Sequence, residues 1–181
     1  MNYVRVYDVL TQARGKLFEW IWPLSQTQYT QSFPFGLRSL RATMIEIALV
    51  EHFYGKRLRE DVLPGTDDYP ISETRQPTFA DLERVWTPQA KETRATLAGI
   101  TDWDRSVLRR TEQPDKIIVS TATKADLATQ LLFHEVHHRA QAMAMLRQLG
   151  VEAQNLDFII FAAKREEFPK DSASERQSGG G

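Results

Sequence analysis

The stretch TKADLATQLLFHEVHHRAQAMAMLRQLG, residues 123–150, decides the fold class because it predicts one long helix. Thr123 and Asp126 have the spacing of an N-terminal capping pair, and Gly150 is the residue type that commonly follows a helix C-terminus. Between them, apolar residues recur at steps of three and four, which places them on one helix face. We expect this face to point into a helical core.

Three further segments carry the same helical spacing. They are Tyr3–Trp22, Leu37–Arg59 and Phe79–Ala98. Pro23 ends the first, and Thr78 is the expected N-cap of the third. Pro88 lies inside the third segment, so we expect either a kink there or a restart of the helix capped by Thr87.

The connections complete an all-α prediction. Residues 60–77 are polar and form a long surface crossover, which permits the second and third helices to run in the same direction. Residues 102–119 fit either a short hairpin or a loop, and residues 156–167 predict a short C-terminal helix. The fold class is therefore a four-helix bundle with a long crossover between helices 2 and 3, plus that short helix. It occupies residues 1–168, and residues 169–181 are expected to be a disordered polar tail.

The composition is that of a globular protein. Of 181 residues, 41% are hydrophobic and 26% are charged, with a formal net charge of −1. Such balanced charge gives no support for nucleic-acid binding, and no apolar run reaches the roughly 18 residues of a membrane span. With no signal-peptide pattern at its start, the chain is expected to be cytoplasmic, without a membrane partner. The absence of cysteine excludes disulfides and thiolate metal sites.

Two histidines lie one helical turn apart in the middle of the apolar face of residues 123–150. His134 and His138 have the i, i+4 spacing that lets two imidazoles bind one metal ion. Glu135 and Arg139 are expected to turn away from the centre of this face. The alternative is a pair of core histidines satisfied by hydrogen bonds, since burying imidazoles without partners costs several kcal/mol.

A third metal ligand is expected from the second helix. Glu46 is the only charged residue in its apolar surroundings, where a carboxylate requires ionic compensation. His52 is the alternative ligand, and it lies about 120° away around the helix. A salt bridge from Glu46 to an arginine on another helix, such as Arg14, is the explanation that involves no metal.

Residues 134–138, HEVHH, also match the H-E-x-x-H pattern of zinc peptidases. In that interpretation Glu135 is the general base that activates a zinc-bound water, and the protein is a zinc hydrolase. Peptidases of this kind usually have a substrate-aligning strand, and no convincing sheet precedes this helix.

The sequence resembles the DinB (damage-inducible) family of four-helix-bundle metalloenzymes. The family pattern of a histidine, two residues and then His-His-Arg-Gly-Gln is similar to residues 134–141, HEVHHRAQ, with Ala140 in place of glycine. The second-helix pattern of Ser, an apolar residue, Arg, any residue and Thr resembles residues 39–43, SLRAT. The resemblance touches most of residues 1–165.

The resemblance implies a metal site. Two positions of the family's histidine triad correspond to His134 and His138, and the third corresponds to Glu46. A carboxylate there shifts the preference among zinc, nickel, iron and manganese toward the harder ions. Arg139 and Gln141 are candidates to steady an anionic ligand or the metal ligands themselves.

The resemblance also implies a function. Family members with an assigned reaction resemble S-transferases and isomerases that use a low-molecular-weight thiol, so we expect a metal-dependent enzyme acting on a small molecule. The family habit and the aromatic content of the helices predict a homodimer. The alternative is a non-catalytic, stress-related bundle whose metal site is structural or vestigial.

Overall fold

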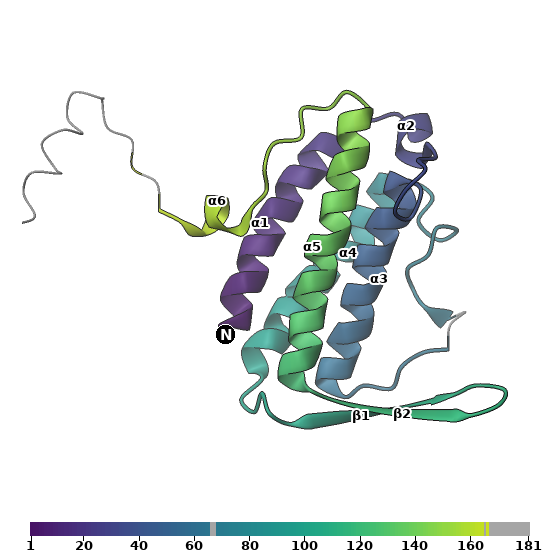
Figure 1. Ribbon diagram of the computed structural model, residues 1–181, viewed down its shortest axis with the longest axis vertical. Coiled ribbons are helices and arrows are strands. Elements are labelled where there is room, and N and C mark those ends of the chain that lie inside the picture. The colour runs from purple at the N-terminus through teal and green to yellow at the C-terminus, as the bar shows by residue number, and fades with distance from the viewer. Residues whose placement is uncertain (66–67, 165, 167–181) are drawn as a thin grey trace, which may run out of the picture.

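The computed structural model describes residues 1–65, 68–164 and 166, and this part of the chain is mostly helical with one small sheet (Figure 1). The expectation of an all-α fold is therefore roughly correct. The long helices are α1 (Tyr3–Ile21), α3 (Leu40–Arg59), α4 (Phe79–Gly99) and α5 (Lys124–Gln148). The short elements are α2 (Gln26–Thr30), α6 (Phe158–Ala162), β1 (Ser106–Glu112) and β2 (Ile117–Thr123).

Helix α3 begins three residues later than its hydrophobic pattern predicts. Gly36 and Arg38 have positive φ angles of 55° and 69°, and a right-handed helix cannot include them. Ser39 then caps the helix, because its side chain accepts a hydrogen bond from the backbone N–H of Ala42. Glu60, in the left-handed conformation, ends the helix at its C-terminus.

The predicted caps of α4 and α5 are confirmed, but the restart at Thr87 is wrong. Thr78 caps α4, and Thr123 forms a reciprocal capping box with Asp126 at the start of α5. Helix α4 runs through Pro88 without interruption. The buried side chain of Trp86 packs just before the proline, and this tertiary packing outweighs the missing backbone hydrogen bond.

The four long helices pack side by side, with α1 and α3 each in contact with both α4 and α5. Gln89 of α4 donates a hydrogen bond to the backbone carbonyl of Ala48 on α3. Thr93, one turn later on α4, donates to Glu51, which is three residues later on α3. Helices α3 and α4 therefore run in the same direction, as the crossover of residues 60–77 permits. Helices α3 and α5 run in opposite directions (Figure 1).

The ambiguous segment after α4 forms a hairpin. Strands β1 and β2 pair antiparallel from Ser106 opposite Thr123 to Glu112 opposite Ile117. The hairpin lies across the C-terminal end of α3 and the N-terminal end of α5 (Figure 1). Val107 on the first strand is buried, whereas Val119 on the second strand is exposed.

The buried apolar residues form two clusters along the helices. One cluster lies toward α2 and includes Met44, Trp86 and Met145, and the other lies toward the hairpin and includes Leu58 and Leu127. Each long helix places a buried polar residue between the two clusters, namely Arg14, Glu51, Thr93 and Glu135. The core therefore has a polar layer near its middle.

The ends of the chain differ in part from the prediction. Helix α2 lies within a polar stretch for which no helix was expected, where Ser25 forms a capping box with Gln28. The C-terminal helix is limited to Phe158–Ala162. The predicted tail, 169–181, lies outside the described residues. Within the part of the chain that is described, no helix is both long enough and apolar enough to cross a membrane.

Candidate metal centre

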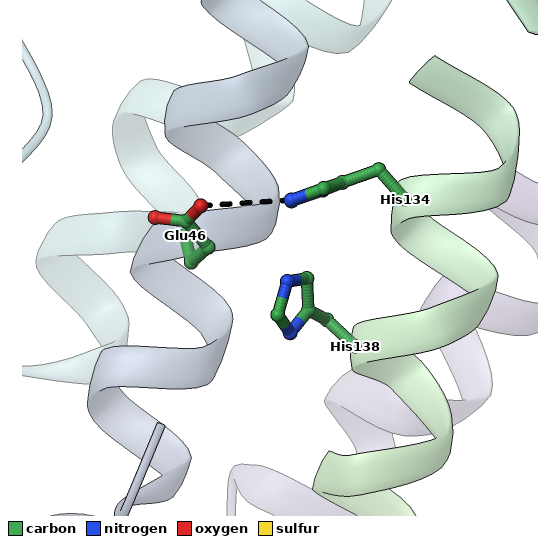
Figure 2. A group of neighbouring side chains, drawn as sticks. All are labelled: Glu46, His134 and His138. Atoms are coloured by element: carbon green, nitrogen blue, oxygen red, sulfur yellow. Dashed lines mark ion pairs between the residues drawn. The ribbon is translucent and has the colours of Figure 1, made fainter. Parts of the chain in front are cut away.

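Helices α3 and α5 bring Glu46, His134 and His138 together. One ligand atom from each of the three lies within 4.8 Å of those of the other two. Nε2 of His134 is 3.5 Å from Oε1 of Glu46, and Figure 2 shows a ring nitrogen of His138 pointing into the space beside this pair. The three residues expected to bind a metal are thus adjacent in space.

The local structure explains this convergence. His134 and His138 are one turn apart on α5, and their ring centroids are 4.4 Å from each other. Helix α3 packs along the same face of α5 in the opposite direction, and one carboxylate oxygen of Glu46 is directed toward His134 (Figure 2). The site therefore depends on one helix pair.

The group is partly open to solvent. The side chains of His134 and Glu46 are 15% and 36% exposed, and His138 is 9% exposed. His138 thus forms the inner side of the group and Glu46 the outer side. An ion held by three protein ligands here would have coordination positions accessible from solvent, which is typical of catalytic rather than structural sites.

Gln141 fixes the orientation of His138. Nδ1 of His138 lies 2.9 Å from Oε1 of Gln141, and the amide oxygen accepts the ring proton. Nε2 of Gln141 is itself 3.0 Å from Nε2 of His137. With its proton on Nδ1, His138 presents the Nε2 lone pair to a metal ion.

Gly36 makes room for this glutamine. A Cβ atom at residue 36 would lie 2.9 Å from Oε1 of Gln141, which is closer than real Cβ contacts. Gly36 also has a φ of 55°, which disfavours any other residue type. The loop before α3 therefore supports a contact that holds a histidine of α5.

The surroundings of Glu46 and His138 favour the protonation states in which these two residues bind metals. The hydrogen bond with His134 and the nearby imidazoles lower the pKa of Glu46, outweighing the effect of burial. Burial lowers the pKa of His138 and favours its neutral form. A carboxylate and neutral imidazoles are the ligating forms.

The donor set fits a divalent transition metal. Two imidazole nitrogens and one carboxylate oxygen form a common catalytic set for zinc, and the same ligand types bind iron, nickel and manganese. The chain contains no cysteine, so metals that demand thiolate do not fit.

His52 does not belong to the group. It lies on α3 beside the ring of Tyr69, and its buried Nε2 has no hydrogen-bond partner among the described residues. The alternative in which His52 replaces Glu46 is not supported by this placement. The proposed salt bridge from Arg14 to Glu46 is also wrong, because Arg14 pairs with Glu51 and Glu135.

Glu135 and Arg139 were expected to turn away from the centre of the apolar face, and the structure shows that both are nevertheless buried. A wider helix face is buried than the apolar pattern indicates, since α1 covers the side on which Glu135 lies. The carboxylate of Glu135 accepts two hydrogen bonds from Arg14. It is therefore committed to an ion pair, which argues against its role as the base of a zinc hydrolase.

Arg139 bonds to the segment after α5 rather than to the metal group. Its Nη2 donates to the backbone carbonyl of Leu156 at 3.3 Å, which ties the segment after α5 back to that helix. Of the two residues expected to steady the site, only Gln141 contacts a member of the group.

The buried polar network around Glu51 was missed from the sequence. Tyr7, Trp86 and Thr93 donate hydrogen bonds to its carboxylate, in addition to Arg14. The available signal was Arg14, a charged residue within the apolar stripe of the first helix. Such a residue requires a buried counter-charge.

Comparison with known proteins identifies a family for this chain. The model of the DinB family matches residues 1–171, which is most of the chain. A search of curated proteins found no match.

Proposed function

The chain belongs to the DinB family, and on that premise we propose that Glu46, His134 and His138 bind a divalent metal ion in a metal-dependent enzyme. The observation that carries the proposal is the convergence of the three ligand atoms within 4.8 Å of one another. The hydrogen bond from His138 to Gln141 supports it, because it leaves the Nε2 lone pair free for a metal.

The partial exposure of the group supports an enzyme over a closed structural site. Glu46 lies at the solvent side, so a small molecule can approach from the direction of the carboxylate. A divalent ion, when bound, lowers the pKa of a coordinated thiol or water. The chain's own residues provide the ligands, hold His138 in one tautomer and keep one side of the site dry.

We propose that the substrate is a small molecule handled with a low-molecular-weight thiol, in an S-transferase reaction. The family supplies this expectation, and the absence of cysteine requires that any thiol come from the ligand. Among zinc, nickel, iron and manganese, the carboxylate in place of a third imidazole favours the harder ions.

We further propose that the four long helices form the four-helix bundle of the family and that the protein is a homodimer. Phe133, Val136 and Phe158 line one apolar cavity between α1, α5 and α6, and all three are exposed. Such a contiguous patch is typical of an interface. Size-exclusion chromatography with light scattering tests the dimer, and a monomer at every concentration would contradict it.

Elemental analysis of the freshly purified protein tests metal binding. We expect about one divalent ion per chain and a lower melting temperature after chelation, since a ligand bound only to the folded state stabilises it. His138→Ala and Glu46→Gln should reduce the metal content. Glu152→Gln is the matched control, because Glu152 is exposed and the substitution removes the same charge.

Cobalt substitution separates an enzyme site from a structural one. We expect 2-mercaptoethanol to produce a sulfur-to-metal charge-transfer band in the cobalt-loaded protein, whereas ethylene glycol produces none. A protein that binds cobalt but shows no response to the thiol would favour a structural or vestigial site. A protein that binds no added zinc, nickel, iron or manganese would overturn the metal proposal itself.

A further inference from the structure

A polar cavity lies at the C-terminal end of α3, beside the first strand of the hairpin. It has a volume of about 530 Å³ and lies between the end of α3, the start of the crossover and β1. Three arginines line it, namely Arg57, Arg109 and Arg110, together with Glu60 and Asp61. None of the proposed metal ligands lines this cavity.

Both carboxylates of the cavity are already neutralised by cations other than Arg57 and Arg109. Glu60 pairs with Arg105 at 2.8 Å and with Lys124 at 3.1 Å. Asp61 pairs with Arg59 at 2.7 Å. The acidic residues of the cavity therefore do not balance Arg57 and Arg109.

Arg57 and Arg109 have no carboxylate partner among the described residues. The third arginine differs, because Arg110 pairs with Glu112 at 3.0 Å. Arg57 is only 9% exposed, and its buried Nε has no hydrogen-bond partner in the part of the chain that is described. A buried guanidinium with an unused donor is unfavourable unless another group accepts from it.

Both guanidiniums lie near the same aromatic ring. Cζ of Arg57 lies 5.7 Å from the centroid of the Phe53 ring, and Cζ of Arg109 lies 4.8 Å from it. These cation–π contacts place two like charges around one ring. Burial lowers the pKa of Arg57, Tyr54 opposes this shift in part, and the charge of Arg109 acts in the same direction as burial.

We propose that this cavity binds a small molecule carrying a phosphate or a pair of carboxylates, with Arg57 and Arg109 as its anion ligands. Guanidinium groups match such oxygens with paired, charge-assisted hydrogen bonds. Leu63, Val107 and Leu108 line the remainder of the cavity and provide contact for an apolar part of the ligand. This site requires no metal and is independent of the proposed function.

Titration calorimetry on the chelated full-length protein tests the site, with inorganic phosphate and citrate as separate probes at constant ionic strength. We expect saturable binding of at least one probe, and the stronger one identifies the anion class. Arg109→Gln should weaken that binding about tenfold or more, because a charge-assisted hydrogen bond contributes about 1.5–3 kcal/mol. Arg109→Lys, which keeps the charge but not the paired donors, should give an intermediate loss.

Arg5→Gln is the control for loss of charge, since Arg5 is exposed and has no ion pair among the described residues. Arg57→Gln tests the buried member, with circular dichroism to verify folding. His138→Ala should bind the anion as the wild type does, which separates this site from the metal group. Absence of saturable binding by both probes, or an equal loss in Arg5→Gln and Arg109→Gln, would overturn the proposal.

Discussion

Arg14 of α1 and Glu135 of α5 form a two-point ion pair inside the helical core. Nε of Arg14 donates to Oε1 of Glu135 at 3.1 Å, and Nη2 donates to Oε2. The same Nη2 donates to Glu51 of α3 at 2.7 Å. One arginine thus connects three helices between the two apolar clusters.

Replacing this arginine should destabilise the fold strongly. Arg14→Met leaves two buried carboxylates without a counter-charge, and breaking a buried ion pair in this way costs about 3–5 kcal/mol. Urea unfolding measures the change, with Arg5→Gln as an exposed control expected to stay within about 0.5 kcal/mol of wild type. A loss below about 1 kcal/mol for Arg14→Met would show that the network is not required for stability.

Removing the amide that orients His138 should weaken metal binding without removing a ligand. Gln141→Leu eliminates the acceptor of the Nδ1 proton, and loss of such a support typically reduces metal affinity about 10–100-fold. Competition with a chromophoric chelator measures the affinity. Gln148→Leu is the control, because Gln148 is exposed on the same helix. Equal affinities for the two variants would mean that Gln141 has no part in the site.

A methyl group at Gly36 should disturb the same contact from the opposite side. Gly36→Ala introduces a Cβ 2.9 Å from Oε1 of Gln141 at a residue whose φ is 55°. We expect a loss of about 1 kcal/mol in stability and weaker metal binding.

Gly15→Ala is the matched control for Gly36→Ala. Gly15 lies inside α1 with nothing within 4 Å of an added Cβ, so the substitution should stabilise the protein by about 0.5–1 kcal/mol. Thermal unfolding and the chelator competition report both quantities. Stabilisation by both alanines would contradict the steric argument.

Much of the fold was predictable because its signals are local. The caps at Thr78 and Thr123 and the spacing of apolar residues define three long helices to within about two residues. The start of α3 was not predictable to this accuracy, since it depends on the positive φ of Arg38, which no local preference requires. Continuity through Pro88 depends on tertiary packing.

The site was predictable where one helix decides the geometry and harder where two helices meet. The i, i+4 spacing brings His134 and His138 together regardless of the rest of the chain. Glu46 could be selected over His52 only by its isolation in an apolar run. The partner of Arg14 could not be deduced, because Glu51 and Glu135 lie on helices whose rotation is set by packing.

His52 provides a titratable group away from the metal group. Burial lowers its pKa below the ordinary value of 6.5, and the charges of Lys56 and Arg59 on its own helix act in the same direction. Glu92 and Gln89 on α4 oppose this shift only in part. The folded protein therefore takes up a proton at this histidine less readily than the unfolded chain does.

This difference predicts a pH dependence of stability in the chelated protein. As the pH falls below 6.5, the unfolded chain protonates His52 first, so the free energy of unfolding decreases down to the folded-state pKa. His52→Gln removes this contribution, and the stability of the variant should decline less between about pH 7.5 and about pH 5.5. Urea midpoints across this range measure the difference, and His138 contributes equally to both proteins. Parallel pH profiles for the variant and the wild type would mean that His52 titrates alike in the folded and unfolded states.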